Sequence, residues 1–211
     1  FDPVRHLPRA IERIDVRMPA PELRESGALL VDTPGLYSRM KFGYDQMTRE
    51  FRFAAASAIF VVKTENLFLE QVFAEFAELL RLFSRIFLVV NLDTAKQDLA
   101  PDGGLRPSLE SIDPAQIVAA FERLSMSAEL KRAWEEGRLG IYPIDLLRAA
   151  SDRLREPAQP TAGEVTAHPA FDRFLGELTA YLDGCDAAVA FVRDSLRQGQ
   201  DLAIDLRVLA R

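Results

Sequence analysis

Four short apolar runs recur along the chain, and segments of helical length separate the later ones. They cover residues 28–31, 58–62, 86–90 and 140–144. A strand that is covered on both faces has this composition, and strands that alternate with helices of ten or more residues are typical of βαβ units. We therefore expect an α/β fold with a mostly parallel sheet and flanking helices.

The spacing of apolar residues between these runs predicts the helices. Apolar side chains recur every three or four residues in five segments, which are 44–55, 69–80, 114–124, 169–182 and 187–209. Asp113 followed by Pro114 predicts an N-cap and a first helical position. Alternating residues at 14–18 predict a half-buried or edge strand, and the polar stretches 93–111 and 156–168 predict loops, the first of them mobile.

Composition narrows the class of protein. The 211 residues carry a net charge of −6 with no basic stripe, which disfavours nucleic acid as a partner. Cys185 is the single cysteine, so an internal disulfide cannot form and we expect a cytoplasmic setting. No apolar run is long enough for a membrane span, so we expect any membrane contact to be peripheral, at the inner membrane.

Ligands of parallel sheets bind beyond the carboxyl ends of the strands, so the residues after each run carry the chemistry. The first run is followed by Asp32, Thr33, Pro34 and Gly35. A carboxylate at a strand end can hold Mg²⁺, and a glycine lets a backbone N–H approach a phosphate closely. The same four residues are also good turn chemistry, so a plain strand-to-loop turn stays open.

A second polar cluster follows the third run. Asn91 and Asp93 come directly after it, and Asn91 lies 59 positions beyond Asp32. One helix, one strand and a second helix are predicted between the two clusters. This order and spacing resemble those of the third and fourth motifs of GTPases in general, and the resemblance favours a nucleotide-binding domain over two unrelated turns.

Residues 14–182 resemble a translation-factor-class GTPase domain, most closely that of the bacterial dynamin-like group. The match rests on residues 31–35 for the third GTPase motif and on Asn91 and Asp93 for a degenerate fourth motif that lacks its lysine. Residues 142–145 occupy the place of the fifth motif. A rival register of the fourth motif runs from Ala95 through Lys96 to Asp98.

The resemblance implies a P-loop-NTPase-like fold that binds GTP or GDP with Mg²⁺. It implies that Asp32 holds the magnesium and that the other matching residues contact the nucleotide. These residues are Thr33, Pro34, Gly35, Asn91, Asp93, Ile144 and Asp145. The expected activity is GTP hydrolysis coupled to conformational change or to membrane-associated assembly.

The phosphate-binding loop of the family has no counterpart in the chain, because no Gly-x-x-x-x-Gly-Lys-Ser/Thr occurs. We expect it upstream, in a longer protein, and we expect the chain as given to bind GTP negligibly. The predicted domains are a GTPase domain over 1–183, without its first strand and P-loop, and a C-terminal helix over 184–211. That helix leads to a neck or stalk, or packs back on the domain.

Two further functions stay open at the sequence level. One is a nucleotide-free pseudo-GTPase that acts as a scaffold or regulatory partner, which the missing lysine of the fourth motif favours. The other is an Era-like or septin-like GTPase. Self-association or membrane binding is expected to involve regions outside this chain.

Overall fold

The computed structural model describes residues 16, 27–33, 55, 57–155 and 168–209. The chain divides into two compact units, Phe1–Ala55 and Ala56–Arg211. The predictions for 14–18 and 44–55 lie outside the described residues, apart from Val16 and Ala55. The second unit contains the sheet and the helices, and it is described here by itself.

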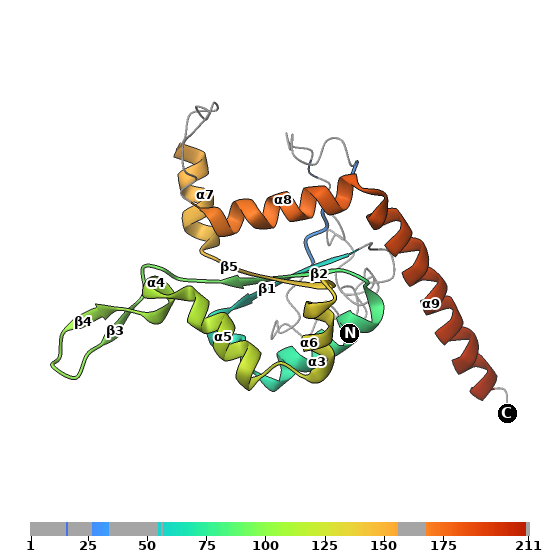
Figure 1. The fold of residues 1–211 in the computed structure, drawn as a ribbon, viewed down its shortest axis with the longest axis horizontal. Coiled ribbons are helices and arrows are strands. Elements are labelled where there is room, and N and C mark those ends of the chain that lie inside the picture. Colours follow the sequence, from blue (N-terminus) through green and yellow to red (C-terminus); the bar gives the residue numbers. More distant parts are fainter. Residues whose placement is uncertain (1–15, 17–26, 34–54, 56, 156–167, 210–211) are drawn as a thin grey trace, which may run out of the picture. The chain divides into compact units, whose positions relative to one another are not determined.

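Three parallel strands form the centre of the second unit, as the apolar runs predict. They are β1 (Ala58–Lys63), β2 (Ile86–Asn91) and β5 (Leu139–Ile144), in the order β1-β2-β5 (Figure 1). The register aligns Lys63 with Asn91 and Asn91 with Ile144, so the three strands end together. The predicted α/β class with a parallel sheet is therefore confirmed.

Burial differs among the three strands. Ile86–Val90 of β2 are fully buried, because β2 is central and covered on both faces. The prediction that β1 is equally buried is wrong, since Val61 is 53% exposed and β1 is an edge of the described sheet. Pro143 lies within β5, the other edge, where a residue without an N–H costs no ladder hydrogen bond on the outer side.

Helices cover both faces of this sheet (Figure 1). On one face lie α3 (Glu70–Leu82), α5 (Pro114–Leu124) and α6 (Ala128–Glu135), and on the other lie α7 (Leu146–Arg155) and α8 (Pro169–Asp183). The helices α3, α5 and α8 match predicted segments to within two residues at each end. Sequence spacing did not predict α6 or α7.

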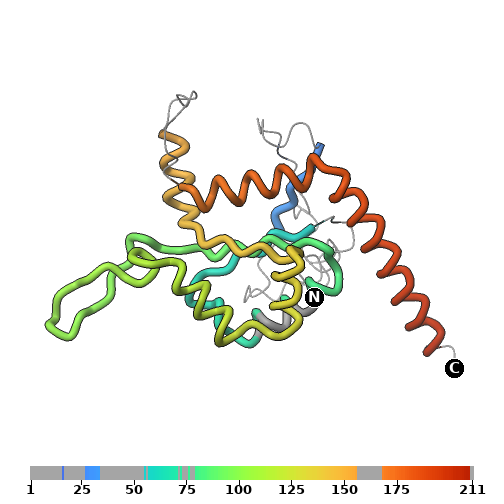
Figure 2. Tube along the Cα trace, in the orientation of Figure 1, coloured from blue at the N-terminus to red at the C-terminus, as the bar shows by residue number. Residues whose placement is uncertain are grey.

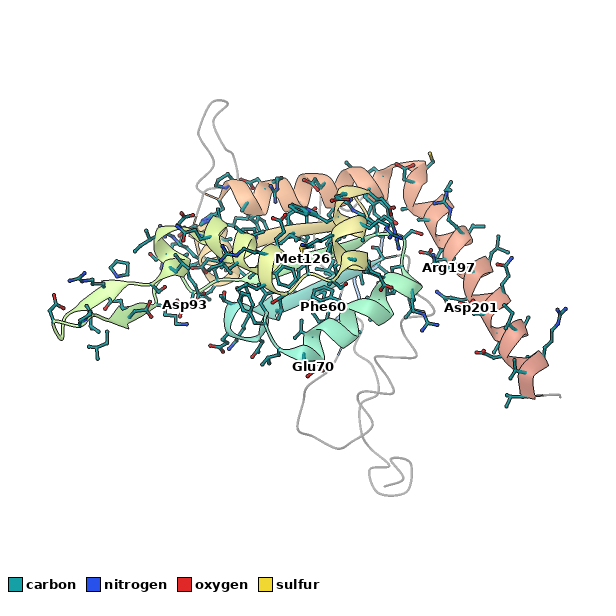
Figure 3. The ribbon with its side chains drawn as sticks, turned by 60° about the horizontal axis from the view of Figure 1, so that its bottom comes forward. Phe60, Glu70, Asp93, Met126, Arg197 and Asp201 are labelled. Atoms are coloured by element: carbon teal, nitrogen blue, oxygen red, sulfur yellow. The ribbon has the colours of Figure 1, made fainter. Side chains whose placement is uncertain are left out.

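Aromatic contacts fill the two interfaces between sheet and helices. On the α8 face, the Phe87 ring stacks on Tyr142 at 6.1 Å and meets Phe174 edge-on. On the opposite face, Phe60 of β1 contacts Phe76 of α3 at 4.9 Å between ring centroids (Figure 3). Successive residues of a strand point to opposite faces, so one short apolar run supplies both cores.

Residues 93–111 are more ordered than the predicted mobile loop. They form a two-stranded antiparallel hairpin, β3 (Gln97–Leu99) with β4 (Leu105–Pro107), followed by the short helix α4 (Leu109–Ile112) (Figure 2). Gly103 has φ +82°, a conformation that favours glycine, and it allows the tight turn of the hairpin. These turn residues therefore connect the two strands of a hairpin and do not mark an unstructured segment.

One local prediction fails in the described residues. The run 28–31 is not a buried strand: no strand is assigned there, and Leu29 is 85% and Leu30 71% exposed. A short apolar run becomes a strand only where a neighbouring strand accepts its hydrogen bonds, and composition does not report that neighbour. The prediction for Asp113 and Pro114 is confirmed, since Asp113 is the N-cap residue of α5 and Pro114 begins the helix. The Asp113 carboxylate accepts from the side chain of Gln116 and not from a helix N–H.

The last helix, α9 (Cys185–Leu209), is held against the rest of the second unit by the buried Asp194 and by Gln198, whose Nε2 donates to the Leu82 carbonyl at 3.3 Å. Asp194 is 3% exposed and accepts hydrogen bonds from the Ser84 N–H at 2.7 Å and the Ser84 hydroxyl at 2.6 Å. Arg197 also donates to Asp194, at 2.9 Å. The first half of α9 is thus tied to the turn between α3 and β2.

The second half of α9 is exposed to solvent. Residues 199–209 are all exposed, and Arg197 and Asp201 mark where the helix leaves the rest of the second unit (Figure 3). Among the described helices, none combines the length and the apolar composition that crossing a membrane requires.

The link through Asp194 predicts a stability effect. We expect Asp194→Ala to lower the free energy of unfolding by about 1–3 kcal/mol, because the Ser84 N–H and Arg197 lose a buried acceptor. Asp201→Ala, an exposed position on the same helix, is the matched control and should leave it unchanged within about 0.5 kcal/mol. Urea unfolding of both variants measures the difference, and equal effects would contradict the proposed role of Asp194.

Candidate functional site at the carboxyl edge of the sheet

The segments that follow β2 and β5 are hydrogen-bonded to each other. The Leu92 N–H donates to the Ile144 carbonyl at 2.9 Å, which extends the strand pairing by one residue. The Leu146 N–H donates to Oδ1 of Asn91 at 3.2 Å. The amide side chain predicted to be in the fourth motif is therefore bonded to Leu146, the residue directly after the segment 142–145 predicted to be the fifth.

Asp145 strengthens this link between the two segments. Its Oδ2 accepts from the backbone N–H of Thr94 at 3.1 Å and from the Thr94 hydroxyl, and its Oδ1 accepts from the Arg148 N–H at 2.9 Å. Burial raises the pKa of Asp145, but these hydrogen bonds outweigh burial and hold it below the ordinary value. Asp145 is therefore an ionised carboxylate that fixes the loop after β2.

Asp93 lies within the loop that Asp145 fixes. Its Oδ1 accepts from the Ala95 N–H at 3.0 Å, which closes a local turn, and its own backbone N–H donates to Glu110 at 2.8 Å. The residue is exposed at the surface (Figure 3). The backbone of Asp93 is thus fixed while its carboxylate stays accessible to a ligand.

Glu110 is the second carboxylate that organises this edge, and it is only 7% exposed. Its Oε2 accepts from the Asp93 N–H and, at 3.0 Å, from the Thr64 hydroxyl, while its Oε1 accepts from Lys96 Nζ at 3.1 Å. Burial raises the pKa of Glu110, but the bonds from Asp93, Lys96 and Thr64 together hold it below the ordinary value. The carboxylate joins residues that follow β1 and β2.

The rival register of the fourth motif is arranged differently. Lys96 is committed to Glu110, and that hydrogen bond raises the pKa of the Lys96 amine. Asp98 lies in β3 opposite Arg106, in the hairpin, and is exposed. The two candidate base-reading carboxylates, Asp93 and Asp98, therefore occupy different elements.

The remaining predicted residues divide between described and undescribed parts. Ile144 is 3% exposed, and its carbonyl is the acceptor of the Leu92 N–H. Asp32 is exposed and Thr33 is half-buried, whereas Pro34 and Gly35 lie outside the described residues. Asp32 and Thr33 belong to the first unit, so their distance from Asn91 and Asp93 is not defined. Across the described residues, no group of three or more His, Cys, Asp or Glu side chains could hold a metal ion.

Sequence reasoning missed four of the residues that organise this edge. They are Thr64, Thr94, Glu110 and Arg148. Their partners are distant in the sequence: Thr64 and Glu110 are 46 positions apart, and Thr94 and Asp145 are 51. The sequence offered one signal, which is that Glu110 is an acidic residue in a stretch that is otherwise predicted to be a loop.

Comparison of the chain with known protein-family models, with curated proteins and with solved structures found no match.

The buried Glu110 and the partly buried Asp145 predict a dependence of stability on pH. A folded-state pKa below 4.5 for Glu110 means that the unfolded chain binds the proton more tightly, so ionised Glu110 stabilises the fold above that pH. This contribution is lost as the pH falls from about 4.5 through the lower folded value. Asp145 acts in the same direction from its ordinary value of 3.8.

We expect Glu110→Gln to lower the melting temperature at pH 7, because the Lys96 ion pair is lost. The variant should also lose less stability than the wild type when the pH falls below 4.5, since one titrating group is gone. Glu129→Gln, on an exposed site of α6, is the control. Thermal unfolding across pH 3–7 tests this. Parallel pH curves for the wild type and Glu110→Gln would exclude Glu110 as the group that titrates.

Proposed function

We propose that the chain is the downstream part of a GTP-binding and GTP-hydrolysing domain of the dynamin-like kind. The observation that carries the proposal is the interlocked pair of loops after β2 and β5, at the sequence positions of the fourth and fifth GTPase motifs. Asp145 and Asn91 hold these two loops together at the carboxyl edge of a parallel sheet. That edge is where α/β sheets bind ligands.

In this proposal Asp93 reads the guanine base. Its carboxylate is exposed, and its backbone is fixed through Glu110 on one side and through the turn to Ala95 on the other. A pre-positioned carboxylate can accept hydrogen bonds from the N1 and N2 positions of guanine with little loss of conformational freedom. Asp145 is a positioning residue, because its own oxygens are occupied by Thr94 and Arg148.

The phosphate and magnesium end of the nucleotide is assigned to the first unit. Asp32 is the proposed magnesium ligand, with Thr33, Pro34 and Gly35 beside the γ-phosphate. The exposure of Asp32 is consistent with a carboxylate that serves a ligand and not the core. When bound, Mg²⁺ would neutralise the charge that develops on the phosphates during hydrolysis.

The long helix α9 supports the dynamin-like assignment. Val189, Val192, Leu196 and Leu206 are all at least half exposed and recur at spacings of three, four and ten residues. This places them on one side of the helix, away from the buried residues Ala187, Ala190 and Asp194. Exposed apolar residues also occur elsewhere around α9, at Phe191, Leu202, Ile204, Val208 and Leu209, so the helix carries apolar surface that the rest of the second unit does not use. Such surface is what a helix leading to a neck or stalk requires.

A pseudo-GTPase scaffold is the second candidate, and the position of Lys96 favours it. The fourth motif needs a lysine along the base, and Lys96 instead donates to the buried Glu110. While Lys96 is paired with Glu110, no lysine of this loop reaches a base.

Base recognition separates the two functions. In the longer protein expected to contain a phosphate-binding loop, Asp93→Asn should weaken GTP binding by roughly 5- to 150-fold and favour XTP, because the carboxamide pairs with the O2 of xanthine. Asp98→Asn is the matched control and should change neither affinity. Equilibrium titration with fluorescent GTP and XTP measures both. If neither substitution changes the GTP-to-XTP preference, the GTPase proposal fails and the scaffold becomes the better reading.

A separate experiment tests whether Asp32 is the magnesium ligand. Asp32→Ala should lower magnesium-dependent GTP hydrolysis in the longer protein by ten-fold or more, on the order expected for loss of one charged contact. The melting temperature should stay within about 1 °C, because Asp32 is exposed. Asp201→Ala again serves as the control. Wild-type turnover in Asp32→Ala would remove Asp32 from the site.

A further inference from the structure

Lys63, the last residue of β1, lies at the edge of the sheet where the GTPase proposal places the nucleotide. Its register partner on β2 is Asn91, and neighbouring strands lie about 4.8 Å apart. The GTPase proposal assigns the base to Asp93 and the magnesium to Asp32. It gives no role to a residue of β1.

The side chains of Lys63 and Asn91 leave their strands on the same face of the sheet. Ile59 of β1 and Phe87 of β2 both pack into the core on the α8 face. Lys63 and Asn91 each lie four residues further along their strands, and residues an even number apart point to one face. Asn91 Oδ1 accepts from the Leu146 N–H at the start of α7, so this face adjoins the segment after β5.

The backbone around Lys63 is fixed on both sides. Lys63 itself pairs with β2, and it is the N-cap residue of a short 3₁₀ helix, η2 (Thr64–Asn66). The Thr64 hydroxyl donates to the buried Glu110 at 3.0 Å. The ammonium group therefore extends from an anchored backbone, as the Asp93 carboxylate does on the neighbouring loop.

Lys63 differs from the other cations on the segments that leave the strands. Lys96 donates to Glu110 at 3.1 Å, and Arg148 lies 3.9 Å from Asp152. Lys63 is exposed, and no residue in the described ranges forms an ion pair or a hydrogen bond with its ammonium group. Its positive charge is thus available to an anion from solution.

The charges along the edge set the direction in which a bound nucleotide extends. Asp93 and Asp145 lie on the segments after β2 and β5, where they repel a phosphate. Lys63 lies on the opposite side of β2 from β5, because the strand order is β1-β2-β5. A nucleotide with its base at Asp93 therefore gains most electrostatic energy when its phosphates extend toward β1.

We propose that Lys63 is a phosphate-binding residue of the nucleotide site, and that its ammonium group donates to the phosphates of a guanine nucleotide whose base is bound at Asp93. A lysine suits this role, since it carries a compact charge on a flexible four-carbon stem. The inference rests on the GTPase proposal. It adds the class of ligand that the second unit selects, which is a nucleoside phosphate and not a free base or a nucleoside.

An exposed lysine on an edge strand can also serve only to prevent pairing with other chains. β1 is an edge of the described sheet, so this role has to be separated from phosphate binding. The two roles differ in one measurable respect. Protection of the edge affects aggregation, and it does not depend on whether a ligand carries phosphates.

The experiment compares guanosine with GDP in a form of the protein that contains a phosphate-binding loop. Lys63→Met should weaken GDP binding by roughly 5- to 20-fold, through loss of one charge-assisted hydrogen bond, and leave guanosine binding within about two-fold of the wild type. Lys63→Arg should restore most of the GDP affinity, because it keeps the charge. Lys131→Met, at an exposed position on α6, is the matched control and should change neither affinity. Competition against fluorescent GDP measures all of these affinities.

Equal GDP affinities of the wild type and Lys63→Met would overturn the role of Lys63, and so would an equal loss of guanosine and GDP binding in that variant. Asp93→Asn should weaken guanosine and GDP binding alike, so it reports on the GTPase proposal separately. If Asp93→Asn has that effect and Lys63→Met has none, the GTPase proposal stands and Lys63 only protects the edge. If the wild type binds neither ligand, the GTPase proposal fails and the role of Lys63 fails with it.

Discussion

The central strand β2 is hydrogen-bonded along both of its edges, and the other features of the second unit follow from this constraint. Parallel pairing with β1 and β5 in one register brings Lys63, Asn91 and Ile144 to the same edge of the sheet. Parallel strands need crossover connections, and these supply the helices that cover both faces. The segments that leave the strands are therefore adjacent whatever their separation in the sequence.

Backbone pairing alone would leave these segments free to move, and two carboxylates fix them. Asp145 connects the segments after β2 and β5, and Glu110 connects those after β1 and β2. Each accepts several hydrogen bonds, which outweigh the cost of burial and keep the pKa of each group low. The exposed carboxylate of Asp93 is carried between these two fixed points, which is a suitable arrangement for recognition of a ligand.

Local signals predicted the elements that depend on local sequence. The Asp113-Pro114 pair and the apolar spacing predicted α5 at its actual bounds, and the run 86–90 predicted β2. The hairpin β3–β4 was missed because its short strands are fully exposed and lack an apolar alternation. The run 28–31 was misread because it has the composition of a strand, whereas no strand is assigned to it in the part of the chain that the structure describes.

The sequence predicted which residues lie at the carboxyl edge of the sheet, but not the hydrogen bonds that join them. Asn91, Asp93 and Asp145 were identified because each follows a strand, a property visible in the sequence. That Asp145 bonds to Thr94, or that Lys96 bonds to Glu110 and not to a base, depends on contacts across 51 and 14 positions. Pairings of this kind are set by the fold, so no local pattern reports them.

The claim that the loops after β2 and β5 form one nucleotide-binding element is tested most directly by hydrogen–deuterium exchange, with and without magnesium GTP, in a form of the protein that contains a phosphate-binding loop. The account predicts that amides in 92–96 and 145–148 gain protection together at saturating nucleotide, because one ligand covers two loops already joined by Asp145. Binding of GTP with no change in protection of either segment would contradict it.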